Sequence, residues 1–585
     1  MKTLLDLLPP ARWCRLLFAL PIAVAAFAAD PAPRPNIIII LADDVGFSDL
    51  GCMGSEIATP NLDKLAADGV RFTQFYNVGR CCPTRASLLT GLYPHQAGVG
   101  HMVESAGSDA YRGDLSPRSV TIAEVLKSAG YRTYAVGKWH VTPFKSAEFL
   151  KDKHNWPLQR GFDHHYGTLA GSGSYYDPAA LESDNKLITV ANDPDYQPAN
   201  GFYYTDAITD HALRFIDDHA RDHAREPFFM YVAFTAAHWP MQASEEDIAK
   251  YKGRYDAGYQ AIRDERWARL KKLGLTDPRW EMSETAGAWT QVPNKAFEAR
   301  CMEVYAAMLD HMDRSIGRIV ADLKARGQFD NTLILFLQDN GGCAEPIGRT
   351  GDYIPRGAAP SLPPMPKDAM NYGGQAPTQT RDGWPVRQGY GVMPGPADTF
   401  IAYGRDWANV SDTPFREYKH WVHEGGISTP LIAHWPKGIS AARNGRFESQ
   451  PGHLIDLMAT CVDLAAAKYP TTAHGEAIPP MEGVSLRSAF AGEPLHRSAP
   501  LFWEHEGNRA IRDGNWKLVL KYPGGWELYD IAADRTEQHD LGGKNPEVVK
   551  TLSAQWEVWA KRVGVRPWAE VQKAEIMAAM GARKS

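Results

Sequence analysis

The sequence predicts an α/β fold with a mostly parallel central sheet. Four apolar runs, rich in β-branched residues, recur along the chain, and each ends abruptly in polar residues. Continuous apolar runs of this length are typical of strands that are buried on both faces, as in parallel sheets. Segments with helix signals lie between the runs, and this alternation indicates helices that flank the sheet. The runs span residues 36–41, 131–136, 228–234 and 332–337.

Three helices are predicted between these strands. Thr59 precedes Pro60, which puts a preferred N-cap residue ahead of a proline at the first helical position. Thr121 and Glu124 form a capping-box pattern before apolar residues, and Gly130 ends that helix. A longer helix is predicted over residues 297–325.

Polar residues that are able to do chemistry follow each of the four strands. In parallel α/β sheets ligands bind beyond the carboxyl ends of the strands, so these residues are expected to share one pocket. Lys138 and His140 stand two apart, and alternation along an extended segment puts both on the same side. The residues at the four exits are Asp43, Asp44, Lys138, His140, His238, Asp339 and Asn340.

Asp43, Asp44, Asp339 and Asn340 form an oxygen-only ligand set, which favours Ca²⁺ or Mg²⁺ over Zn²⁺. Each pair leaves a buried strand, where unpaired carboxylates would be costly without a cation. The alternative is two unrelated turns, because Asp and Asn also suit loop positions. Two such pairs at two strand exits favour the metal site.

The segment CCPTRASLLTG, residues 81–91, places a thiol and an arginine at the start of a predicted short amphipathic helix. Pro83 suits a first helical turn, because its missing N–H would be unpaired there anyway. Cys81 and Arg85 are therefore expected at a helix N-terminus, which attracts anions such as sulfate or phosphate. Taken alone, the segment would favour a buried structural cysteine beside a helix cap. The rest of the chain reverses that preference.

This segment resembles the sulfatase signature, Cys-x-Pro-Ser/Thr-Arg, with Thr84 in place of the more common serine. The resemblance extends over about residues 35–541 and is closest to bacterial arylsulfatases. It implies an alkaline-phosphatase-like fold, and a formylglycine made from Cys81 whose hydrated aldehyde is the nucleophile. It also implies one Ca²⁺ held by the four oxygen ligands and the Cys81-derived hydroxyl.

The same resemblance implies a role for each remaining polar residue. Arg85 would balance the charge of the modified side chain, and His140 would partner its hydroxyl. Lys138 would bind a sulfate oxygen, and His238 would contact the ester oxygen. Lys419, five residues before Glu424-Gly425-Gly426, would bind sulfate and the leaving oxygen. The family often continues Gly-Lys-x-His with Leu-Gly, whereas this chain has Val-Thr. Three further residues are possible contacts: His423, Trp503 and His505.

Domain organisation is predicted from shifts in composition. Residues 1–28 have the basic, apolar and small-residue pattern of a cleaved signal peptide, which predicts a periplasmic or secreted protein. Residues 29–492 form the predicted catalytic domain, with a helical insertion at about 242–294 and a Gly- and Pro-rich, lid-like loop at about 345–413. Residues 493–585 form a smaller α+β domain with antiparallel strands and a terminal helix over 546–563.

Composition excludes some partners. The net charge of −6 argues against nucleic acid, and no later segment is apolar enough for stable membrane insertion. Seven cysteines in a scattered set indicate no disulfide framework, although one bridge is possible.

The expected function is hydrolysis of sulfate monoesters, of aryl or saccharide type, after modification by a formylglycine-generating or other maturation enzyme. One alternative is a phosphate or phosphonate ester hydrolase on the same fold. Another is a non-catalytic secreted binder of sulfated ligands, if Cys81 is unmodified. Five aromatic residues are candidate walls of the substrate site: Tyr175, Tyr176, Trp384, Tyr390 and Tyr403.

Overall fold

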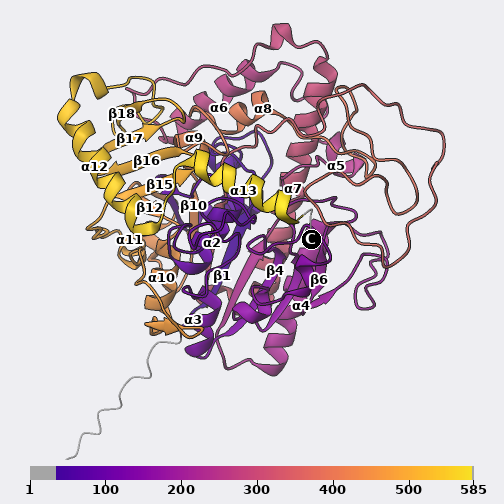
Figure 1. Cartoon of the computed structure of the whole chain (residues 1–585), viewed down its shortest axis with the longest axis horizontal. Coiled ribbons are helices and arrows are strands. Elements are labelled where there is room, and N and C mark those ends of the chain that lie inside the picture. The colour runs from indigo at the N-terminus through magenta and orange to yellow at the C-terminus, as the bar shows by residue number, and fades with distance from the viewer. Residues whose placement is uncertain (1–33, 583–585) are drawn as a thin grey trace, which may run out of the picture. The chain divides into compact units, whose positions relative to one another are not determined.

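A ten-stranded mixed sheet forms the centre of the computed structural model, which describes residues 34–582 (Figure 1). The four predicted strands are confirmed as β1 (Asn36–Ala42), β4 (Arg132–Lys138), β8 (Phe228–Ala233) and β9 (Thr332–Gln338). They are neighbours in the order β9-β1-β8-β4, and all three pairings are parallel. Their carboxyl ends therefore lie at one edge of the sheet.

The remaining strands extend this sheet on both sides. β10 runs antiparallel to β9, so the sheet is mixed rather than wholly parallel. The full order is β11-β2-β10-β9-β1-β8-β4-β5-β6-β7. The added strands are β2 (Val70–Phe72), β5 (His164–Thr168), β6 (Leu181–Ser183), β7 (Lys186–Leu187), β10 (Leu431–His434) and β11 (Arg446–Glu448).

Strand β1 shows why these apolar runs form strands. Ile37 and Ile39 face one apolar core, whereas Ile38 and Ile40 face the other, and each is at most 1% exposed. A strand with two buried faces needs apolar residues at every position, which explains the continuous run.

Helices cover both faces of the sheet (Figure 1). The predicted capping box at Thr121 is present, and the long helix begins two residues before its predicted start. Thr59 lies at the N-cap of α1, but its hydroxyl hydrogen-bonds Asp63 and the Gly51 amide rather than capping the helix. One face packs α2 (Cys81–Thr90), α3 (Ile122–Ser128) and α10 (Asp456–Leu464), and the other packs α1 (Pro60–Ala67), α4 (Tyr204–Asp222) and α7 (Lys295–Ala325).

A four-stranded antiparallel sheet forms the C-terminal part, with β15 (Leu501–His505), β16 (Asn508–Asp513), β17 (Trp516–Leu520) and β18 (Trp526–Asp530). Helix α12 (Pro546–Val563) has its predicted bounds, whereas α13 (Trp568–Ala582) was not predicted. Trp503 and Trp556 of this part belong to the same core as α2 and α3. The C-terminal sheet therefore packs directly on the elements that carry the thiol segment.

The two predicted irregular regions differ in content. Residues 242–294 contain two α-helices, α5 (Glu245–Ala249) and α6 (Tyr259–Leu273), and a 3₁₀ helix at Trp289–Gln291. From residue 345 the loop has no helix or strand until α8 (Arg405–Ser411). The other short elements are α9 (Glu424–Ile427), α11 (Arg487–Ala491), β3 (Phe75–Tyr76), β12 (Gly452–His453), β13 (Thr472–Ala473) and β14 (Glu476–Ala477).

The predicted signal peptide lies outside the described residues. Between residues 34 and 582, no helix combines the length and the apolar character needed to cross a membrane. The six cysteines in this range are all free and buried, so the one possible bridge is not formed among them.

Candidate active site

The polar residues of the four strand exits converge at the carboxyl edge of the parallel strands. Lys138 is the last residue of β4 and His140 follows it by two residues, and the others follow β1, β8 and β9 within one to five residues. Cys81 and Arg85 enter from α2, and Lys419 enters from the loop before α9. None of these side chains belongs to a residue that is more than 4% exposed: Asp43, Asp44, Cys81, Arg85, Lys138, His140, His238, Asp339, Asn340 and Lys419.

Several oxygens of the predicted ligand set are left without a protein partner, as expected for a site that binds a cation. Asn340 Nδ2 donates to Asp44 Oδ1 over 2.7 Å, which ties the two pairs together. Among residues 34–582, no group hydrogen-bonds three of the buried oxygens: Asp43 Oδ1, Asp44 Oδ2 and Asn340 Oδ1. Buried polar atoms are rarely left unpaired, and oxygens are the ligands that Ca²⁺ prefers. The donor set therefore fits a hard divalent cation.

Three buried cationic side chains face the carboxylates. Arg85 Nη2 is 2.8 Å from Asp339 Oδ2 and 3.4 Å from Asp43 Oδ2. Lys138 Nζ is 2.5 Å from Asp43 Oδ2, and Lys419 Nζ is 2.7 Å from Asp44 Oδ1. Burial raises the pKa of Asp339 to about 8 despite the nearby Arg85. When all three carboxylates are ionised they balance the three cations, so a bound divalent cation would make the pocket positive.

Cys81 is the first residue of α2 and is 2% exposed. The neighbouring Cys82 thiol, together with Lys138, lowers the pKa of Cys81 well below its ordinary value. All ten residues of α2 are buried, so the prediction of an amphipathic helix was wrong. The reason is that α2 lies in the core that also holds α10 and the C-terminal sheet, which leaves no face for solvent.

Lys138 and His140 reach the same pocket, but not through an extended segment. His140 has a φ of +54°, so its backbone is left-handed and the predicted alternation does not apply. The ring lies 3.2 Å from Cys82 Sγ through Nε2, and burial lowers the pKa of His140 to about 4. Gly171 lies against the ring, where an added Cβ would come within 2.1 Å of a ring carbon. This glycine is what allows His140 to lie beside the thiols.

His238 and Lys419 lie together beside Asp44, whereas Arg85 pairs with Asp43 and Asp339. His238 Nδ1 donates to the Trp239 carbonyl oxygen over 2.7 Å, which turns Nε2 towards the pocket. That Nε2 is 3.4 Å from Lys419 Nζ and 3.5 Å from Asp44 Oδ2. Burial lowers the pKa of His238 to about 4, whereas Asp44 raises the pKa of Lys419 well above its ordinary value. Lys419 is therefore the charged member of the pair.

Sequence reasoning missed two residues at the mouth of the site. The Glu345 carboxylate accepts from Trp239 Nε1 at 3.0 Å, pairs with Arg80 Nη2 at 3.0 Å and lies 3.8 Å from Lys419 Nζ. Its side chain is 30% exposed, so it marks the boundary between the buried residues and solvent. Their positions in the sequence could have indicated both residues, since Arg80 precedes Cys81 and Glu345 closely follows Asn340.

Glu424 ties the loop that carries Lys419 to the C-terminal part of the chain. Its two carboxylate oxygens are 2.9 Å from Lys517 Nζ and 2.8 Å from Arg535 Nε, and all three side chains are at most 1% exposed. These charges lower the pKa of Glu424 to about 2 despite its burial. The C-terminal sheet thus holds the end of the segment that carries Lys419.

Two of the possible contacts lie away from the pocket. His423 Nε2 is directed at Glu527 on β18, at 3.5 Å, and Trp503 Nε1 donates to the Asn77 carbonyl oxygen. His505 is buried in a different cluster with His420 and Glu506.

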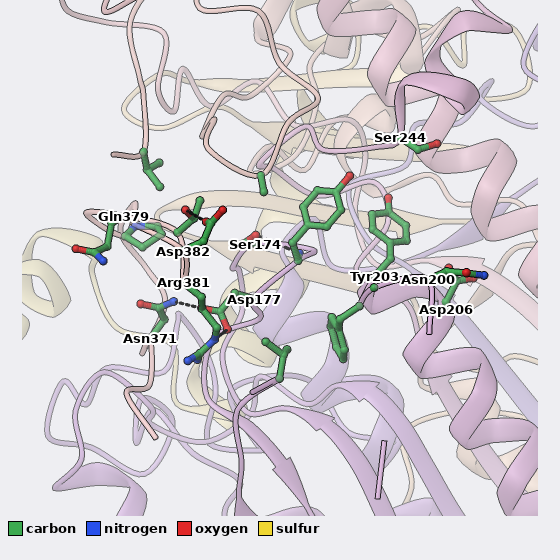
Figure 2. Close-up of a pocket in the computed structure, with 18 of the residues that line it drawn as sticks. Ser174, Asp177, Asn200, Tyr203, Asp206, Ser244, Asn371, Gln379, Arg381 and Asp382 are labelled. Atoms are coloured by element: carbon green, nitrogen blue, oxygen red, sulfur yellow. Dashed lines mark hydrogen bonds and ion pairs between the residues drawn. The ribbon is translucent and has the colours of Figure 1, made fainter. Parts of the chain in front are cut away.

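A cavity of about 720 Å³ lies between the 174–206 segment and the 371–397 part of the long loop (Figure 2). Asp177 and Arg381 form an ion pair there at 2.7 Å, and Asn371 donates to Asp177. A second cavity, of about 170 Å³, shares lining residues with the first. A third, of about 510 Å³, shares loop residues with the second and is lined by Trp239, the neighbour of His238. Through these shared lining residues the three cavities lie in series along the loop, and we call this series the track.

Of the five predicted aromatic walls, only Tyr176 lines this track. Tyr175 is 1% exposed and donates to the Thr235 carbonyl oxygen, and Tyr403 is buried against Tyr305. Tyr390 packs on Phe297, and Trp384 packs under Arg356. Most of these rings therefore stabilise the loops rather than line a cavity.

The family model described as Sulfatase matches residues 35–467, and the one described as N-sulphoglucosamine sulphohydrolase, C-terminal, matches residues 416–561. An uncharacterized sulfatase of Schizosaccharomyces pombe is 33% identical and covers 91% of this chain and 94% of the relative. An arylsulfatase of Klebsiella aerogenes is 32% identical and covers 80% and 94%. A solved structure of Ps i-CgsB in complex with k-i-k-neocarrahexaose has a TM-score of 0.61 at 26% identity, over 90% of this chain and 93% of that one. The predicted alkaline-phosphatase-like fold is confirmed by these similarities.

Proposed function

This chain belongs to the sulfatase family and is a sulfuric ester hydrolase, and we propose that it works through a formylglycine at position 81 and one Ca²⁺. The observation that carries this proposal is the meeting of Cys81, three unpartnered ligand oxygens and three buried cations at one sheet edge. Asp43, Asp44, Asp339 and Asn340 would hold the ion, together with the side chain at 81. Bound there, Ca²⁺ would polarise a sulfate oxygen and favour the ionised form of the group at 81.

The modified residue would supply one hydroxyl to attack sulfur and a second whose deprotonation releases sulfate. Arg85, which is held by Asp339, would fix the charge of that side chain at the helix N-terminus. Lys138 and Lys419 would bind the sulfate oxygens, since each Nζ already lies within 2.7 Å of a carboxylate at the site. Each well-placed donor of this kind contributes about 3–4 kcal/mol to transition-state stabilisation.

His140 and His238 are proposed to move protons on opposite steps. His140 lies beside the cysteine pair, so it would accept the proton from the second hydroxyl. His238 lies beside Lys419, so these two would assist the departing alcohol or phenol. A neutral imidazole suits His140, which accepts a proton, because burial lowers its pKa to about 4. To donate to the leaving oxygen, His238 would have to carry a proton on Nε2 as well as on Nδ1, a form that the Asp44 carboxylate favours and burial opposes.

Sulfated saccharides are the substrate class that the surroundings support best. The track of cavities begins at Trp239, beside the leaving-group side, and is lined by carboxylate, amide and guanidinium groups as well as aromatic rings. The similar structure of Ps i-CgsB holds a neocarrahexaose. Aryl sulfates are the second substrate class that we propose, because the Klebsiella relative is an arylsulfatase.

We also propose a periplasmic or secreted location and a dependence on a formylglycine-generating or other maturation enzyme. The predicted signal at residues 1–28 supports the first, and Cys81-x-Pro83-Thr84-Arg85 supports the second.

The test is a side-by-side measurement of kcat/KM on aryl sulfates, sulfated oligosaccharides, and the matching phosphate and phosphonate esters. We expect sulfate esters to be preferred, and oligosaccharides to be preferred over their monosaccharide units. Faster phosphate or phosphonate turnover would favour the alternative hydrolase. Sulfate-ester binding without turnover by protein whose Cys81 stays an intact thiol, even when it is produced with a maturation enzyme, would favour a non-catalytic binder.

A further inference from the structure

A second group of metal-binding side chains lies outside the proposed calcium site. His420 follows Lys419 in the loop before α9, His505 is the last residue of β15, and Glu506 is in the turn to β16. One ligand atom from each lies within 4.8 Å of the other two. His420 Nδ1 is 3.3 Å from Glu506 Oε2, and His505 Nε2 is 3.4 Å from Glu506 Oε1. Residues 85 positions apart in the chain thus place two imidazoles on one carboxylate.

His505 is the observation that indicates a ligand. The residue is 0% exposed, yet neither Nδ1 nor Nε2 has a hydrogen-bond partner within the described chain. Buried polar groups are rarely left without a partner, and a bound ion is one of the explanations for such a group. Burial lowers the pKa of His505 and lowers that of His420 to about 4, so both rings are neutral and each has one lone pair. His420 would bind through Nδ1, with its Nε2 facing Asn508 Nδ2 at 3.4 Å.

The spacing agrees with first-row metal coordination. A tetrahedral ion with bonds of about 2.0–2.1 Å separates its ligand atoms by about 3.3–3.4 Å. The two measured nitrogen–oxygen distances, 3.3 and 3.4 Å, are of this size and end at different oxygens of Glu506, so one of the two oxygens would serve as the ligand. Imidazole nitrogens favour Zn²⁺ and related ions over Ca²⁺, whereas the oxygen set at Asp43 and Asp339 has the opposite preference.

We propose that His420, His505 and Glu506 bind a divalent transition metal, with Zn²⁺ as the best match. Three protein ligands leave a fourth position open, and a cavity of about 400 Å³ lined by His420 and Glu506 lies beside it. Lys419 and Glu345 line the same cavity, so the ion would lie next to the sulfatase site without sharing its ligands.

A hydrogen-bonded support surrounds the carboxylate. His101 Nε2 is 2.8 Å from Glu506 Oε1, and its Nδ1 is 2.7 Å from Glu575 Oε1 on α13. Such partners orient the first ligands of metal sites. These contacts pair Glu506, whose side chain is 20% exposed, without a metal, whereas the ring nitrogens of His505 have, in the described part of the chain, only the 3.4 Å approach to Glu506. The ion would join the Lys419 loop, the C-terminal sheet and α13.

The experiment is a titration of the calcium-loaded full chain with Zn²⁺, followed by calorimetry, and with Co²⁺, followed by its visible absorption. Asp339→Ala removes the other metal site, so the second site is measured in that background as well. We expect one equivalent of Zn²⁺ in both, and a loss of affinity of about 100-fold or more in His505→Gln and in Glu506→Gln. His101→Gln should weaken binding by about 10- to 100-fold.

His211→Gln is the matched control, because His211 is also buried but lies on α4, remote from this cluster. The Glu506→Gln variant keeps the test decisive if His505→Gln does not fold, since it changes one carboxylate oxygen only. Absence of a Zn²⁺ equivalent in the Asp339→Ala background would overturn the proposal. Unchanged Zn²⁺ affinity in Glu506→Gln would overturn it too.

Discussion

His238 and Lys419 provide a test of how the leaving group departs. The Trp239 carbonyl oxygen holds His238 Nδ1 at 2.7 Å, so only Nε2 is free to reach a substrate, and it lies 3.4 Å from Lys419 Nζ. In His238→Ala the lysine stays in place, because Asp44 still pairs with it at 2.7 Å. The variant therefore removes one group from the ester oxygen and leaves the sulfate-binding charge intact.

The expected magnitudes differ between the two residues. A positioned acid or base contributes about 10²- to 10⁴-fold, and this matters most when the leaving group is basic. His238→Ala should therefore lose about 100-fold more activity on the poorest leaving group than on the best. Lys419→Ala should lose about 10²- to 10³-fold across the whole series, because its charge also binds sulfate oxygens.

The assay is kcat/KM over a series of phenyl sulfates of graded leaving-group pKa, with formylglycine content measured for each variant. His434→Ala is the control, since His434 is also buried but pairs with Ile334, near the opposite edge of the sheet. A slope that is unchanged in His238→Ala would refute its role at the leaving group and leave Lys419 as the better candidate.

Three further predictions concern the metal, the support and the acid limit. Chelation should abolish activity, Ca²⁺ should restore it better than Zn²⁺, and Asp339→Ala should lose metal and rate together; metal content that is unchanged in this variant would show that the ligand set is misassigned. Lys517→Met should lower the free energy of unfolding by about 3–5 kcal/mol, because Glu424 and Glu537 would be left buried without this partner; urea unfolding measures this, and a loss below 1 kcal/mol would contradict it. Burial lowers the pKa of His211 to about 4 from an ordinary value of 6.5, so its stabilising contribution is complete above pH 6.5 and falls by about 3 kcal/mol as the pH drops to 4. His211→Gln should flatten that part of the stability–pH curve, and an unchanged curve would exclude His211 as a source of acid sensitivity.

Much of the fold could be predicted because its determinants are local. A strand buried on both faces needs a continuous apolar run, and a capping box needs two residues three apart, so β1 and α3 are visible in the sequence. Because parallel strands share one direction, the polar exits of β1, β4, β8 and β9 were expected to meet, and they do.

The features that were missed depend on contacts between distant segments. The role of Glu345 depends on its contacts with Arg80 and Trp239. The role of Glu424 depends on its contacts with Lys517 and Arg535 of the C-terminal part. The left-handed backbone at His140 depends on Gly171 making room for its ring. No periodicity or spacing reports such pairings, because the partners lie about 30 to 270 positions apart in the chain.

The central claim is that Cys81 becomes the nucleophile only after oxidation to formylglycine, and one measurement tests it directly. Protein produced with different amounts of a maturation enzyme would be digested, and the fraction of the residue 81 peptide that carries the aldehyde or its hydrate would be measured by mass spectrometry. The same preparations would be assayed for kcat on an aryl sulfate. The account predicts that kcat rises in proportion to the modified fraction and extrapolates to near zero without it. Full activity in a preparation with an intact thiol at position 81 would contradict the account.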